Sequence, residues 1–125
     1  MNLLDLIPGN RISGELFNNI SDDILAAINP QKLPLIERFN QFNLKSKQQI
    51  MDIIQNSSQE KYYILYTHPV KEKKNRLYVS EKGDLLNFID SRFNEERGDG
   101  MDIIISDMSY KSLIVGNHDG MLLEV

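Results

Sequence analysis

The sequence lacks the residues and runs that mark several whole classes of protein. It has no cysteine, which excludes disulfides, thiolate nucleophiles and thiolate-bound zinc. Its apolar runs are far shorter than the ~20 residues that a membrane-spanning helix needs. The start of the chain has no basic segment followed by a long apolar run, so it does not resemble a signal peptide. These absences predict a cytoplasmic protein with no membrane partner.

A patch of one charge sign is also missing. The net charge is −4, and both halves of the chain, divided at residue 60, are mildly acidic. A nucleic-acid-binding protein normally has a basic face or arm, so we expect no nucleic-acid partner. A Gly-rich phosphate loop, a Gly-x-Ser-x-Gly turn and a His-Glu-x-x-His pair are absent as well, and we predict no cofactor. The frequent Asn, Ile, Lys and Asp residues favour a bacterial or phage source.

Hydrophobic residues make up 41% of the sequence, which is enough to build one core. The length of 125 residues fits a single domain over residues 1–125. Within it, helical patterns fill residues 1–58 and strand patterns begin at residue 59. The polar segment 55–58 separates the two parts.

Three helices are expected in the first part. Ser21 can cap a helix over residues 21–28, because the aspartates that follow it favour the positive end of the helix dipole. Pro34 suits the first turn of a second helix that carries Phe39. Residues 46–56 have the apolar spacing of a third helix.

The second part predicts an antiparallel sheet of about five strands. The expected strands are residues 62–67, 77–79, 101–106, 112–116 and 121–125, joined by turn-forming segments. Between the second and third strands, residues 85–93 have the spacing of an amphipathic helix. The order of elements indicates an α+β fold with helices on one side of the sheet. We expect the helix residues Leu85, Ile89 and Phe93 to pack on the sheet face that carries Ile103 and Ile105.

The sharpest short motif is Gly-Asn-His-Asp-Gly at residues 116–120. Calcineurin-like metallophosphoesterases contain a similar segment, in which Asn and His bind two metal ions. The other ligands of that family are missing here, and the same residue types tolerate the positive φ of a tight turn. We therefore interpret the segment as a hairpin turn. His118 and Asp119 remain candidates for binding.

Four acids lie near the last three strands, and they are Asp102, Asp107, Asp119 and Glu124. Paired carboxylates can hold a magnesium ion or act in acid–base catalysis. Such residues are more often solvated strand ends and turn caps. Asp107 is kept as a candidate binding residue, without a catalytic role.

The predicted hairpin over residues 62–79 combines tyrosines with a basic cluster. Tyr62 and Tyr66 are expected on one face, with Tyr63 and Tyr78 on the other, and exposed tyrosines are favoured at binding surfaces. The basic residues Lys73, Lys74 and Arg76 could contact an acidic partner. Such a cluster more often keeps the tip of a hairpin, and with it the edge of a sheet, soluble.

The last third of the chain has a recognisable layout. A strand over residues 102–105 is followed by Asp107, a strand over residues 112–115, the segment Asn-His-Asp-Gly at residues 117–120, and a short final strand. This layout resembles the ends of small bacterial proteins grouped with SUKH-like immunity proteins, which neutralise a toxin by binding it. The resemblance implies an α+β fold and a binding role without catalysis.

Two functions follow as the leading hypotheses, and a third is a structural subunit that acts only in an oligomer. The first is a non-enzymatic protein-binding module, such as an immunity protein, an antitoxin or a phage-type inhibitor, with a protein partner that could be a toxin. The alternative is a small metal-dependent hydrolase that uses His118 and the nearby acids. The sequence leaves the oligomeric state open.

Overall fold

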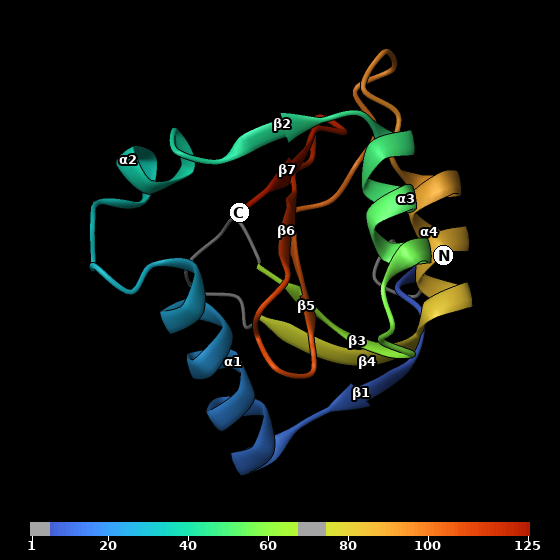
Figure 1. Cartoon of the computed structure of the whole chain (residues 1–125). Coiled ribbons are helices and arrows are strands. Elements are labelled where there is room, and N and C mark those ends of the chain that lie inside the picture. The colour runs from blue at the N-terminus through green and yellow to red at the C-terminus, as the bar shows by residue number, and fades with distance from the viewer. Residues whose placement is uncertain (1–5, 68–74) are drawn as a thin grey trace.

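A computed structural model describes residues 6–67 and 75–125, which form an α+β fold (Figure 1). The described elements, in chain order, are β1 (Asn10–Ile12), α1 (Gly14–Ile28), α2 (Leu35–Phe39), β2 (Asn43–Lys45), α3 (Lys47–Asn56), β3 (Lys61–Tyr66), β4 (Arg76–Glu81), α4 (Lys82–Arg92), β5 (Ile103–Asp107), β6 (Leu113–Gly116) and β7 (Leu122–Glu124). The predicted fold class is confirmed.

The strands form one sheet in the order β1-β4-β3-β5-β6-β7-β2. Every neighbouring pair is antiparallel, and the five strands expected from the sequence make up its interior. The two additional strands, β1 and β2, form the edges. Each has three residues, too few to show the alternation of a strand in the sequence.

Helices cover both faces of the sheet, so the expectation of helices on one side is wrong. Helices α3 and α4 lie together against one face, whereas α1 lies on the other (Figure 1). The cause is visible in the central strand β5, which is buried at all five positions. A strand that is buried on both sides has a continuous apolar run, here Ile103–Ile105, and such a run indicates that both faces of the sheet are covered.

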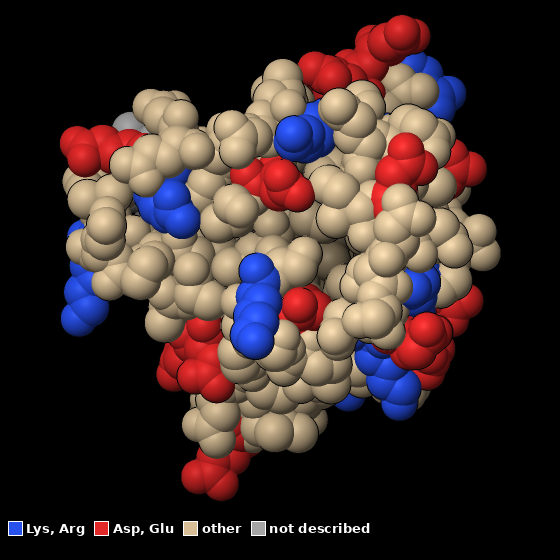
Figure 2. Space-filling view, in the orientation of Figure 1, with Lys and Arg blue, Asp and Glu red and all other residues tan. Residues whose placement is uncertain are grey.

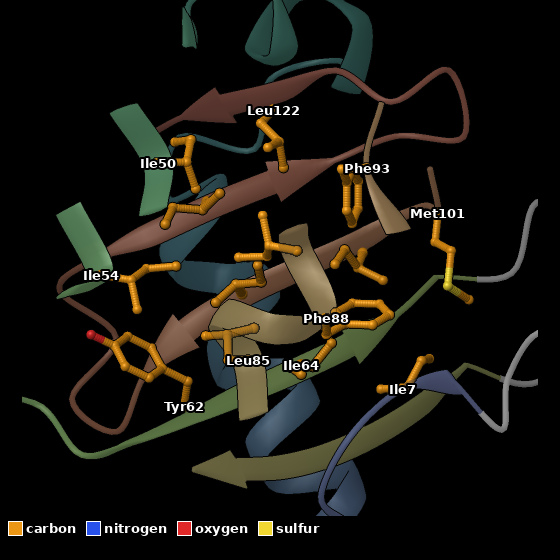
Figure 3. Close-up of a cluster of buried hydrophobic side chains, with 14 of the residues drawn as sticks. Ile7, Ile50, Ile54, Tyr62, Ile64, Leu85, Phe88, Phe93, Met101 and Leu122 are labelled. Carbon is orange, nitrogen blue, oxygen red and sulfur yellow. The ribbon is translucent and has the colours of Figure 1, made fainter. Parts of the chain in front are cut away.

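The core beneath α3 and α4 is closed. Leu85, Ile89 and Phe93 pack with Ile103 and Ile105 in one cluster, as predicted. Figure 3 shows Leu85 and Phe93 of this cluster between the helices and the sheet. Gly116 lies under the ring of Phe93, where a Cβ atom would come within 2.7 Å of Cε1. The absence of a side chain on β6 therefore makes room for this ring.

Helix α3 follows the local rules closely. The Ser46 hydroxyl accepts a hydrogen bond from the Gln49 backbone N–H at 3.1 Å, and the Ser46 N–H donates to the Gln49 side chain at 2.9 Å. This reciprocal pair is a capping box, which satisfies two free donors at the start of a helix. The predicted helix over residues 46–56 is confirmed.

Helix α1 begins seven residues before the predicted start. Its N-cap is Ser13, and Ser21 is a buried residue in the middle of the helix. Residues 14–20 include a glycine and two asparagines, which are poor helix formers. The burial of Ile20, Ile24 and Ile28 against the sheet stabilises the helix in spite of this local preference.

Candidate functional site

A groove lies between the C-terminal half of α1 and the sheet. Its volume is about 900 Å³, at the upper end of the range of ligand-binding pockets. One wall is helical and the other is formed by the sheet. The lining residues are mostly apolar: Leu25, Ala26, Ile28, Asn29, Pro30, Lys32, Leu33 and Phe39 on the helical side, and Thr67, Asp102, Ile103, Ile104, Val115, Gly116, Asn117 and Leu123 on the side of the sheet.

The helical wall is held in place by side chains that bond to the backbone. The Asn29 side chain donates to the Leu33 carbonyl at 2.8 Å and accepts from the Leu33 N–H at 3.0 Å. Arg38 of α2 donates to the carbonyl of Ile28 at 2.5 Å, and its guanidinium lies 4.7 Å from the centre of the Phe42 ring. These contacts fix the segment between α1 and α2, so the groove is a preformed feature of the fold.

Two large apolar side chains at the groove are left open to solvent. Leu25 is 41% exposed and Phe39 is 40% exposed. The Phe39 ring makes an edge contact with Phe42, with 5.5 Å between the ring centres. Exposed apolar side chains that gather at a hollow are typical of surfaces that bind a ligand or another protein.

A carboxylate and an imidazole meet where β5 begins. The Asp102 carboxylate accepts a hydrogen bond from the His118 backbone N–H at 3.1 Å, and its Oδ1 lies 3.1 Å from the ring atom Nδ1 of His118. The hydrogen bond to Asp102 and the charge of Asp102 raise the pKa of His118, and the charge of Asp119 acts in the same direction. Asp102 lines the groove, whereas the His118 side chain is 71% exposed.

Residues 117–120 form a tight turn, which confirms the interpretation of the Gly-Asn-His-Asp-Gly segment. The Gly120 N–H donates to the Asn117 carbonyl at 3.1 Å, and the Asn117 side chain accepts from the Asp119 N–H at 3.0 Å. Gly120 has φ +86°, and a Cβ atom there would lie 2.5 Å from the Asp99 carbonyl oxygen. Both glycine properties, positive φ and small size, are needed at this position.

The acids near the last strands are not gathered into one site. Asp102 precedes β5 and Asp107 ends it, so the two lie at opposite ends of the strand. Asp107 is 6% exposed, and its carboxylate accepts from the Ser109 N–H at 3.0 Å and the Lys111 N–H at 3.1 Å. It therefore caps the turn between β5 and β6. Within residues 6–67 and 75–125, no group of three or more His, Asp or Glu side chains could hold a metal ion.

The tyrosines of the β3–β4 hairpin do not lie as expected. Tyr62 is 2% exposed and belongs to the core under α3 and α4 (Figure 3), so the expected exposure of this side chain, on which its predicted binding role depended, is wrong. Burial raises the pKa of its phenol group. Tyr78 packs in the same core as Tyr62, and Tyr63 packs on the opposite face, because Tyr78 pairs with Ile64 and not with Tyr63.

The remaining candidate binding residues of the hairpin lie partly within the described residues and partly outside them. Tyr66 and Arg76 are half-buried, and Tyr66 packs at the margin of the closed core. Lys73 and Lys74 lie outside the described residues. The structure therefore does not bring the predicted hairpin residues together with His118 and Asp119 as one described surface.

The surface charges are mixed on the face shown in Figure 2. Acidic and basic side chains are interspersed there with wide neutral stretches. No helix in the described part of the chain has the length and apolarity needed to cross a membrane.

Comparisons with protein-family models, curated proteins and solved structures find no match to the chain. The resemblance of its last third to SUKH-like immunity proteins therefore stays a prediction. The groove was not expected from the sequence, because Leu25 and Phe39 look like core residues of amphipathic helices. Only the placement of α1 on the sheet, with α2 held beside the end of α1, shows that these side chains are left open.

Proposed function

We propose that the chain is a non-enzymatic protein-binding module that neutralises a partner by binding it, in the manner of an immunity protein, antitoxin or phage-type inhibitor of the bacterial cytoplasm. The observation that carries this proposal is the groove beneath α1, with Leu25 and Phe39 about two-fifths exposed beside it. When a partner covers an apolar hollow of this size, apolar surface is removed from water, which lowers the free energy of the complex.

The hydrogen bonds that join α1 to α2 support binding of a partner. Arg38 joins α2 to the last turn of α1, and Asn29 holds the connection between them. Less conformational entropy is lost on association when the surface already has its bound shape. Covering Leu25 and Phe39 would then contribute to affinity with little reorganisation.

The hydrolase alternative has no comparable support. His118 contacts Asp102 and lies 3.7 Å from Asp119, but among the described residues no group of three or more His, Asp or Glu side chains could hold a metal ion. The groove is lined mainly by aliphatic side chains, which stabilise no developing charge. We therefore propose binding as the function of this surface.

The test measures binding to the product of a neighbouring gene. Leu25→Asp and Phe39→Asp should each weaken the complex at least tenfold, or about 1.4 kcal/mol, when measured by titration calorimetry. Leu44→Asp is the matched control, because Leu44 is also exposed, at 53%, but does not line the groove. If the groove variants bind as tightly as the parent and the control, the groove is not the contact surface.

A further inference from the structure

The sheet ends in two edge strands, β1 and β2, which lie at its opposite borders (Figure 1). Among the described strands, β1 pairs only with β4 and β2 pairs only with β7. The outer side of an edge strand carries backbone N–H and C=O groups that can pair with another chain. The two edges differ in the side chain that accompanies these groups.

On β2, the residue whose backbone faces outward is Leu44. The Val125 N–H donates to the Leu113 carbonyl, which is one bonded pair between β6 and β7. Bonded and non-bonded pairs alternate along an antiparallel ladder, so Leu123, two residues before Val125, also bonds to β6. Its partner on β2 is Leu44, and this pair is therefore a non-bonded one. Leu44 thus directs its N–H and C=O away from the sheet.

On β1, the same alternation places Arg11 at the outward position. The Lys82 N–H donates to the Glu60 carbonyl, so the bonded pairs between β3 and β4 include Tyr78, which is the partner of Arg11 on β4. Arg11 is exposed, and a charged side chain protects an edge from pairing. Leu44 is 53% exposed and gives β2 no such protection.

Leu44 ends an apolar row that crosses the sheet. It pairs with Leu123, which pairs in turn with Val115, and the side chains of paired residues lie on the same face. Leu123 and Val115 pack on the face covered by α1. A second leucine placed beside Leu44 would continue the row and remove both exposed side chains from water.

The opposite face of this edge carries one charge of each sign. Lys45 pairs with Leu122, and Glu124 pairs with Asn43. Neither Lys45 nor Glu124 has an ion pair among the described residues. In an antiparallel pairing of two β2 strands centred on Leu44, Lys45 lies opposite Asn43 of the second copy. Glu124 of that copy is then two strand spacings, about 10 Å, from Lys45, and the two long side chains can meet.

We propose that β2 pairs with β2 of a second copy of this chain across a two-fold axis at Leu44. The N–H of each Leu44 donates to the carbonyl of the other, the two leucine side chains meet on the α1 face, and Lys45 and Glu124 form ion pairs between the copies on the other face. Such a contact is self-complementary, because the same residues supply both halves. Strands of three residues make a small contact, so the dimer is weak and depends on concentration.

The groove is separate from this contact. Neither Leu44 nor Lys45 lines it, and a two-fold axis perpendicular to the sheet leaves both grooves open on the same face of the joined sheets. The proposal therefore goes beyond the proposed function and can be tested with the protein alone.

The first experiment measures the mass of the protein by sedimentation velocity from about 10 μM to about 1 mM, the range of a weak dimer. The mass should rise from that of one chain toward that of two. Leu44→Asp places two carboxylates at the axis and should raise the dimer Kd at least tenfold. Arg11→Asp at the other edge and Leu25→Asp at the groove are matched controls and should leave this Kd unchanged.

A charge exchange tests the two-fold arrangement. Lys45→Glu and Glu124→Lys should each raise the dimer Kd about threefold or more, because each places like charges together. The double variant restores opposite charges and should return the Kd close to that of the parent. A variant that merely destabilised the fold would not be rescued in this way, and melting temperatures show that each variant is folded.

Cross-linking locates the contact directly, because the chain has no cysteine of its own. Leu44→Cys should give a covalent dimer with a short bis-maleimide reagent, since the two positions meet at the axis. Arg11→Cys puts the same thiol at the outward position of β1 and should remain largely monomeric under the same conditions.

Several results would overturn the proposal. They are a chain that stays monomeric up to about 1 mM, a dimer that is insensitive to Leu44→Asp, equal cross-linking at the two edges, and a double charge variant as weak as the single ones. None of these results bears on the groove, whose proposed function fails only if the complex with the partner is insensitive to the groove variants.

Discussion

The two faces of the sheet belong to the same strands but are covered by helices to different extents. On one face, α3 and α4 lie side by side and cover a core that contains Leu85, Ile89 and Phe93. On the other, α1 covers the part of the sheet near β4, and the groove lies between its C-terminal half, the connection to α2 and the strands β5–β7. The comparison separates a face that is closed by two helices from a face that leaves apolar side chains exposed.

The largest expected effect is in the closed face. Phe93 is 1% exposed, and its ring lies over Gly116 and makes an edge contact with Phe88, at 6.1 Å between ring centres. Phe93→Ala should lower the free energy of unfolding by about 3–5 kcal/mol in denaturant titrations, because it leaves a cavity that the surroundings cannot fill. A loss below about 1 kcal/mol would show that this face is not tightly closed.

A matched pair of smaller deletions compares the two faces directly. Ile89 in the closed core is fully buried, and Ile28 beside the groove is 2% exposed. Each Ile→Val change removes one methylene group, with a typical cost of about 0.5–1.5 kcal/mol. The loss of unfolding free energy should lie near the upper end of this range for Ile89→Val and near the lower end for Ile28→Val. The reason is that side chains at an open groove can move to fill the space left by the methylene group. Equal losses in chemical denaturation would contradict the difference between the faces.

A still smaller effect on stability is expected at the groove surface itself. Leu25→Ala should change the free energy of unfolding by less than about 0.5 kcal/mol, because the side chain is already 41% exposed and the change leaves no buried cavity. The same variant should weaken the complex with the partner. A loss of both stability and affinity would mean that Leu25 acts in the fold and not in binding.

The smallest expected effect on stability is that of His118, and it depends on pH. Its pKa is raised by Asp102, so the protonated form stabilises the fold below the unfolded pKa of about 6.5, and this contribution is lost as pH rises through the higher folded pKa. His118→Ala should remove that pH dependence, measured as the melting temperature between pH 5 and 8, while leaving the fold intact. Asp102→Asn should flatten the same profile.

Metal ions provide the control for this histidine. Manganese or zinc at modest excess should not raise the melting temperature of the parent protein. A metal-dependent rise that disappears in His118→Ala would favour the hydrolase alternative.

The sequence predicted the parts of this protein that local chemistry decides. The apolar spacing over residues 46–56 predicted α3, whose start is stabilised by the capping box of Ser46 and Gln49, and the residue types at positions 117–120 predicted a turn. The apolar spacing over residues 85–93 predicted both the helix and the face that it buries. In each case, the residues that interact lie within a few positions of one another, or one face of the element is clearly apolar.

Tertiary structure decided the features that bear on function. Residues 14–20 are weak helix formers and became helical because Ile20, Ile24 and Ile28 are buried on the sheet. Strands β1 and β2 exist through pairing with β4 and β7, because three residues carry no periodic pattern. Tyr62 became a core residue and Leu25 a surface residue because the positions of the helices, and not the residue types, determine which apolar side chains are covered. The groove is formed by residues of α1, α2 and three strands, which are far apart in the sequence. It therefore exists only when the chain is folded.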